Sequence, residues 1–142
     1  MKSQKRNLLP WAVFLIYCAW MLLLLFDREQ AEQSINLEPL RTIRLFVRVL
    51  MYDPSEYNIR LAVINLFGNI ILFIPLGYFL PRLWKGLRKW WRTWCMTLII
   101  MTAVELSQFF TLRGTCDVDD LILNLLGAAM GYCLFRIFKK DR

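Results

Sequence analysis

The sequence predicts an all-α membrane protein with four transmembrane helices, because its apolar residues form long blocks and its basic residues gather on one side of those blocks. Of the 142 residues, 58% are hydrophobic, and the mean hydropathy is +0.42. Soluble domains are closer to half apolar and contain about a quarter charged residues. A soluble domain of ordinary composition is therefore excluded.

Four apolar runs of 18 to 21 residues carry the prediction, and only the third has an acidic residue inside it, Glu105. At about 1.5 Å of rise per residue they span about 27 to 32 Å, which matches a hydrocarbon core of about 30 Å. We expect one membrane domain over residues 1–142, with no room for a separate soluble domain. Its helices are expected at about 8–26, 61–81, 93–112 and 118–138.

The distribution of charge predicts the topology of these helices. Twelve of the 18 Lys and Arg residues lie at 2–6, 82–92 and 136–142, whereas nine of the 11 acids lie on the other side of the spans. By the positive-inside rule, both termini are cytoplasmic, and the 27–58 loop and the 113–120 turn face outward. The net charge of +7 therefore reflects the membrane topology of the chain. Because the basic residues are explained in this way, we expect no nucleic-acid partner.

The first outer loop contains a segment with helical spacing, residues 36–51. Arg41, Arg44 and Arg48 recur at i, i+3 and i+7 and so share one face, while apolar residues cover much of the rest. This pattern predicts an interfacial helix, with Pro39 in its first turn and arginines that meet anionic lipid headgroups. The alternative is a short helix that caps the bundle with a solvated basic edge.

Several kinds of chemistry are absent from the composition. There is no His, which removes the commonest general base and the imidazole metal ligand. The four Cys residues show no C-x-x-C spacing, and three of them fall inside predicted spans. Neither a zinc site nor a disulfide framework is expected.

Polar residues inside or beside the spans are the candidate ligand-binding residues. They are Asn65 and Asn69 in the second span, Glu105 and Gln108 in the third, Arg113 in the following turn, and Asp117, Asp120 and Asn124 at the start of the fourth. Within each helix their spacing places them on one face. The residues inside the spans lie roughly 5 to 12 Å below the outer boundary. We therefore expect one polar pocket that opens outward.

Two features of this set point to function. A carboxylic acid within a span costs about 2.5 to 3.5 kcal/mol near the bilayer centre, so Glu105 should face the bundle interior, with Arg113 or the asparagines as partners. Asp117 and Asp120 offer the hard oxygen ligands that suit Mg²⁺, which makes them a candidate metal site. The alternative is structural: the Asn and Gln side chains form hydrogen bonds between helices.

Gly127 and Gly131 extend the polar stripe of the fourth span. They form a small-xxx-small pattern, which allows two helix backbones to approach closely. The contact is expected either between helices or between two copies, as a homodimer.

Four sequence blocks occur together in one order. They are NLEPLRTI (36–43), NLFGNIILFIPLG (65–77), ELSQFF (105–110) and DVDDLILNLLGAAMGY (117–132). In order and spacing the chain resembles the VanZ-like membrane proteins, from about residue 8 to residue 138. The matching motif positions are Asn65, Asn69, Pro75, Gly77, Glu105, Gln108, Asp117, Asp120, Asn124 and Gly127. One departure is Glu38-Pro39-Leu40, where relatives tend to have an apolar residue, Pro and Phe.

The resemblance implies a multi-pass protein of the bacterial cytoplasmic (inner) membrane with four helices. The family takes its name from a member that confers antibiotic resistance, specifically to teicoplanin. Many relatives lie outside resistance clusters.

Three hypotheses of function follow. The first is that the pocket binds a polar group of a cell-envelope amphiphile, either a lipid-linked precursor or a lipoglycopeptide such as teicoplanin. The second is an intramembrane enzyme that acts on a phospholipid or polyprenyl carrier, with Glu105 and an aspartate as acid and base. Against it, the sequence offers no Ser or Cys nucleophile beside a base and no phosphate-binding Gly-rich loop. The third is an assembly module of an envelope complex.

Overall fold

The structure, a computed structural model, describes residues 8–26, 35–36, 38–52, 54–111 and 116–140. Its helices are α1 (Leu9–Phe26), α2 (Arg41–Tyr52), α3 (Glu56–Leu83), α4 (Trp90–Phe110) and α5 (Val118–Lys140), with a 3₁₀ turn, η1, at Lys85–Leu87. In the part of the chain described, α1, α3, α4 and α5 are long and apolar enough to cross a membrane. The predicted all-α class with four spanning helices is confirmed.

α3 starts five residues before the predicted boundary, at Glu56 rather than at 61. Ser55 is its N-cap, and the Ser55 side chain accepts a hydrogen bond from the backbone N–H of Asn58 at 3.3 Å. The Glu56 carboxylate lies in the first turn, where the helix dipole favours negative charge. Hydropathy alone could not find this start because Arg60 interrupts the apolar run.

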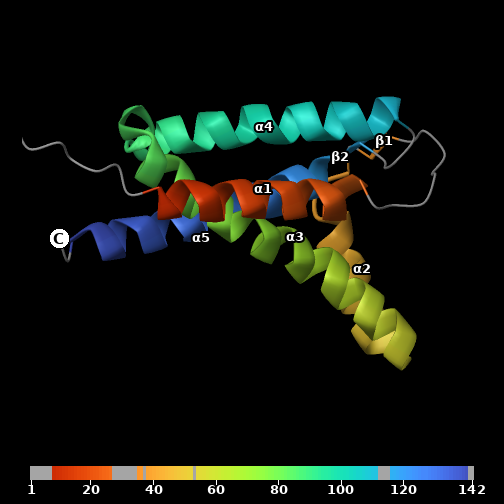
Figure 1. Ribbon diagram of the computed structural model, residues 1–142. Coiled ribbons are helices and arrows are strands. Elements are labelled where there is room, and N and C mark those ends of the chain that lie inside the picture. Colours follow the sequence, from red (N-terminus) through yellow and green to blue (C-terminus); the bar gives the residue numbers. More distant parts are fainter. Residues whose placement is uncertain (1–7, 27–34, 37, 53, 112–115, 141–142) are drawn as a thin grey trace, which may run out of the picture.

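The spanning helices lie side by side, except that the first half of α3 leaves the bundle (Figure 1). The start of α1, η1 and the end of α5 gather at one end of the molecule, and the end of α1, β1, β2 and α2 lie at the other (Figure 1). This arrangement agrees with an even number of spans. That the end with the start of α1 and the end of α5 is cytoplasmic stays a prediction.

The closest helix contact joins α3 and α5, and glycines make it possible. A Cβ added at Gly77 would overlap the backbone of Ala128, and one added at Gly127 or Gly131 would overlap backbone carbonyls of α3. Small residues allow two backbones to touch in this way. The small-xxx-small contact is therefore formed within the chain, on an α5 face that α3 covers. The homodimer through Gly127 and Gly131 stays a prediction.

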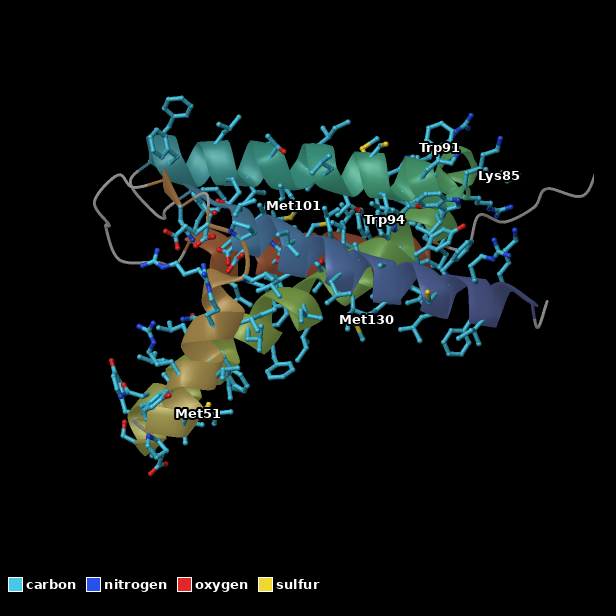
Figure 2. The ribbon with its side chains drawn as sticks, turned by 180° about the vertical axis from the view of Figure 1, so that it is seen from behind. Met51, Lys85, Trp91, Trp94, Met101 and Met130 are labelled. Atoms are coloured by element: carbon cyan, nitrogen blue, oxygen red, sulfur yellow. The ribbon has the colours of Figure 1, made fainter. Side chains whose placement is uncertain are left out.

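The apolar core lies among α1, the second half of α3, and α4. Phe73 and Met101 are fully buried in it, and Figure 2 shows Met101 between α4 and the helices beside it. The Tyr17 hydroxyl of α1 donates to the carbonyl oxygen of Leu72 in α3 at 2.8 Å, so the buried phenol has a partner. This core fixes α1 against α3, which sets one wall of the site described below.

α2 and residues 56–68 of α3 form a helical hairpin, the α2–α3 arm, which extends away from the bundle (Figure 1). The rings of Phe46 and Phe67 meet edge to face at 6.1 Å between centroids. No residue of α2 is buried in the described structure. Figure 2 shows Met51 at the tip of the arm, with Lys85 and Trp91 at the opposite end of the molecule. That this helix lies in the membrane interface stays a prediction.

The expected start of the loop helix was wrong. α2 begins at Arg41 rather than near Asn36, and Pro39 lies in the preceding turn instead of in the first helical turn. The reason is backbone conformation: Leu40 has a φ of 64°, in the left-handed region, which a right-handed helix cannot contain.

Candidate functional site

A cleft of about 800 Å³ opens between α1, α3 and the first residues of α2 and α5. Its apolar wall consists of side chains from one face of α1 and one face of α3: Trp20, Leu24, Ile64, Ile71, Leu72 and Pro75. Gly68 lies in this wall and leaves it hollow, since nothing beyond Ile64 comes within 4 Å of where its Cβ would be.

The other end of the cleft is polar. Asn65 and Asn69 reach it from α3, and Thr42 reaches it from α2. Asp117 comes from β2, directly before α5, and Asp120 comes from the first turn of α5. The Asn69 amide donates a hydrogen bond to the Asp120 carboxylate, which ties α3 to α5 at this point. Four of the residues predicted from the sequence, Asn65, Asn69, Asp117 and Asp120, are thus brought together.

Asp117 is held in place by three hydrogen bonds. Both of its carboxylate oxygens accept from the side-chain amide of Asn36 at 2.9 Å, and Oδ1 also accepts from the backbone N–H of Asp119 at 2.8 Å. The bond from the Asp119 N–H makes Asp117 the N-cap of α5. The backbone supports the pair, because β1 (Ile35–Asn36) and β2 (Cys116–Asp117) lie parallel with Asn36 opposite Asp117.

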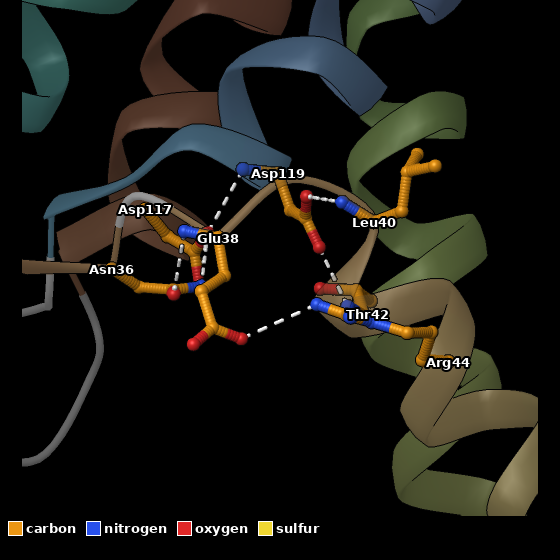
Figure 3. A network of polar contacts seen from close by, with 7 residues as sticks. All are labelled: Asn36, Glu38, Leu40, Thr42, Arg44, Asp117 and Asp119. Carbon is orange, nitrogen blue, oxygen red and sulfur yellow. Dashed lines mark hydrogen bonds and ion pairs between the residues drawn. The ribbon is translucent and has the colours of Figure 1, made fainter.

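Asp119 has a role that the sequence reasoning missed. Its side chain is 2% exposed, and its two oxygens accept from the backbone N–H groups of Leu40 and Thr42, each at 2.6 Å (Figure 3). Leu40 has no side-chain oxygen to cap α2, so Asp119 supplies the cap from a distant part of the chain. The only sequence signal was an apolar residue at the cap position of an amphipathic helix.

Three further candidates do not line this cleft. Glu105, Gln108 and Asn124 are each at most 6% exposed and lie in the helix packing. Gln108 donates to the carbonyl oxygen of Leu25, in the last turn of α1, at 2.6 Å. This is the bond between helices that the structural alternative predicted for Gln108. The expectation that all polar residues meet in one pocket is wrong for these three, and their roles in binding stay predictions.

Two further predictions concern charge in the site. Arg113 lies outside the described residues. Asp117 and Asp120 share the cleft, but no group of three or more His, Cys, Asp or Glu residues that could hold a metal ion occurs among the described residues. Mg²⁺ therefore stays a prediction that rests on two carboxylates.

The sequence model of the family described as VanZ/LLP1 matches residues 11–139. The chain belongs to the VanZ/LLP1 family. No curated protein and no solved structure was found to match it. In this VanZ/LLP1 protein the match runs from α1 into α5, so it includes every residue of the cleft. The family resemblance seen in the sequence blocks is confirmed, as is a multi-pass membrane protein.

Proposed function

We propose that this VanZ/LLP1 protein binds a cell-envelope amphiphile from the bacterial inner membrane. The single observation behind the proposal is the two-part lining of the cleft. One end presents carboxylates and amides, and the rest is apolar side chains of α1 and α3. An apolar chain along the helices and a polar head beside Asp117 and Asp120 would match both parts.

The position of the cleft between two spanning helices favours entry of a ligand directly from the membrane. Its apolar wall is formed by two spanning helices, and Trp20 and Ile71 remain more than half exposed in the chain alone. Such side chains face hydrocarbon in a bilayer, so a lipid tail reaches the cleft without crossing water. A volume of about 800 Å³ lies in the range of small-molecule sites.

The cleft can be filled by one substitution. Gly68→Leu places a side chain in the hollow wall, where the nearest atom to a new Cβ is Ile64 Cγ2 at 3.9 Å. Gly86→Leu is the matched control, because Gly86 lies in η1 with nothing within 4 Å of an added Cβ. Both proteins are extracted in mild detergent, and co-purified lipid is measured by native mass spectrometry.

We expect the wild type and Gly86→Leu to retain an amphiphile and Gly68→Leu to lose it. Equal retention by all three proteins would contradict the proposal. The assembly hypothesis predicts no retained lipid in any of them, and chemical conversion of the lipid would favour the enzyme hypothesis. Adding teicoplanin to the same preparation tests whether a lipoglycopeptide displaces the lipid.

A further inference from the structure

Basic side chains from two separate parts of the chain gather at the end of the molecule where α5 ends. Lys85, Arg88 and Lys89 come from η1 and the residues after it, and Arg136 and Lys139 come from the last turns of α5. We infer that these five residues, the basic end, bind the headgroup phosphate of an anionic membrane lipid. The basic end lies apart from the cleft, so this inference goes beyond the proposed function and does not depend on it.

A hydrogen bond between distant positions joins the two parts of the basic end. The Tyr132 hydroxyl of α5 donates to the backbone carbonyl oxygen of Arg88 at 2.8 Å. Arg136 lies four residues after Tyr132 and therefore shares its helix face, on the side of α5 that meets the loop before α4. The cations of the loop and those of α5 thus belong to one surface.

The positive charge of the basic end is not neutralised by acids. Of the 11 acids in the sequence, ten lie at 27–56 and 105–120. The other is Asp141, which lies outside the described residues together with four basic residues of the two chain ends. In the described part of the chain, none of the five cations forms an ion pair. The sequence therefore leaves this end strongly positive even when Asp141 is counted.

The helix dipoles do not change this balance. α1 and α4 begin at this end, and the N-terminus of a helix is equivalent to roughly half a positive charge. α3 and α5 end there, and their C-termini contribute the opposite half charges. The four dipoles cancel, so the charge that a ligand meets is that of the side chains.

Tryptophan side chains place the basic end at the depth of lipid headgroups. Trp84, Trp90 and Trp91 are 39, 58 and 46% exposed in the chain alone, and Figure 2 shows Trp91 and Lys85 at the same end of the molecule. Exposed Trp residues at the ends of spanning helices lie at the boundary between membrane and water. Cations between them meet lipid phosphates, which is why a lipid rather than a soluble anion is the expected ligand. On the predicted topology, this lipid belongs to the cytoplasmic leaflet.

Two neighbouring arginines have a different task. Arg82 donates to the Tyr78 hydroxyl oxygen at 3.0 Å, and Arg92 donates to the carbonyl oxygen of Gly86 at 3.1 Å. They hold the loop and the helix end in place. The exposed side chains of Lys85, Arg88 and Lys89 have no such bond to another described residue, so their donors are available to a phosphate.

The test uses tryptophan fluorescence of the full-length protein in nanodiscs. Phosphatidylglycerol or phosphatidylethanolamine with brominated acyl chains is added in small amounts, because bromine quenches tryptophan only at short range. Trp20→Phe removes the tryptophan that lines the cleft. Of the remaining five, Trp11 contacts Trp84 at 5.0 Å between ring centroids, and Trp90 contacts Trp94 at 5.7 Å. Quenching therefore reports lipid at the basic end.

We expect phosphatidylglycerol to associate with the basic end about 25-fold more strongly than phosphatidylethanolamine. This is about fivefold for each of two cations in contact with the phosphate, which corresponds to about 1 kcal/mol for each. Equal quenching by the two lipids would overturn the inference.

Two variants and a control of equal charge locate the site. The combined substitution Lys85→Gln, Arg88→Gln and Lys89→Gln should lower the lipid ratio about fivefold or more. Arg136→Gln should lower it about fivefold from the side of α5, which keeps the test informative if the loop variant folds poorly.

The control is the combined substitution Arg41→Gln, Arg44→Gln and Arg48→Gln, which removes three charges from α2 at the other end of the molecule. It should leave the ratio at the basic end unchanged. A decrease as large as that of the loop variant would show that net charge, and not this site, attracts the lipid.

Inorganic phosphate distinguishes a lipid headgroup from a free anion. We expect sodium phosphate and sodium chloride of equal ionic strength to weaken quenching equally, by screening alone. Release of the lipid by phosphate only would show a site for free phosphate and overturn the assignment. Gly68→Leu, which fills the cleft, should leave the ratio unchanged, and a loss of preference in this variant would show that the lipid is held by the cleft instead.

Discussion

The two halves of α3 differ although they belong to one continuous helix. In the second half, Phe73, Leu76 and Leu80 are buried, and the backbone touches α5 at Gly77. In the first half, Ile64 and Phe67 are exposed, and the main neighbour is α2. The second half of α3 holds the bundle together. The first half lines the cleft and is supported mainly by its packing against α2.

Two glycines of α3 show the same difference on a smaller scale. Gly77 admits no side chain, because a Cβ would overlap Ala128, while Gly68 faces open space with one contact at 3.9 Å. The packing of the bundle and the shape of the cleft are therefore separable along a single helix.

The largest effect is expected from Gly131→Ala. Its new methyl group would overlap the carbonyl of Ile74 and lie 2.8 Å from the backbone nitrogen of Tyr78, so α3 must move away. Overpacking against backbone costs about 3 kcal/mol or more. Unfolding by denaturing detergent measures this cost, with Gly86→Ala as the matched control. A stability equal to that of the control would show that α3 and α5 are not in backbone contact.

An intermediate effect is expected from Asp119→Ala. It removes the acceptor of two backbone N–H groups at the start of α2, which costs about 2 kcal/mol. Hydrogen exchange in nanodiscs should become faster in α2 and stay unchanged in the second half of α3. Uniform acceleration in both regions would mean that the arm and the bundle form one cooperative unit.

The smallest effect is expected from Glu38→Gln. Its ion pair with Arg44 is 3.2 Å long, but both side chains are largely exposed, so the pair contributes at most about 1 kcal/mol. Exchange in α2 should stay within the error of the wild type. A change as large as that of Asp119→Ala would show that the ion pair, and not the buried carboxylate, fixes the arm.

The sequence was sufficient for the spanning helices and for part of the site. Long apolar runs predict helices whatever their neighbours are. Helical spacing placed Asn65 with Asn69 and Asp117 with Asp120, and all four line the cleft. The common depth grouped the two asparagines with other polar residues of the spans, and those do not line it: Glu105, Gln108 and Asn124. Depth is only one coordinate, however. The rotation of each helix about its axis decides which polar residues meet, and packing sets that rotation. Gln108 lies at a suitable depth but turns to the end of α1.

The cap of α2 could not be predicted for a different reason. Leu40 and Asp119 are 79 positions apart, and neither periodicity nor hydropathy connects positions that distant. The pairing of Asn36 with Asp117 is equally non-local, since 81 positions separate the two residues.

The cap also has a consequence for biosynthesis. The backbone N–H of Thr42 donates to the carboxylate of Asp119, which lies 77 residues later in the chain. At about 5 to 20 residues per second, the ribosome needs about 4 to 15 seconds to make that stretch. α2 thus leaves the ribosome well before its partner, and the polar end of the cleft is completed only when the last span has been inserted.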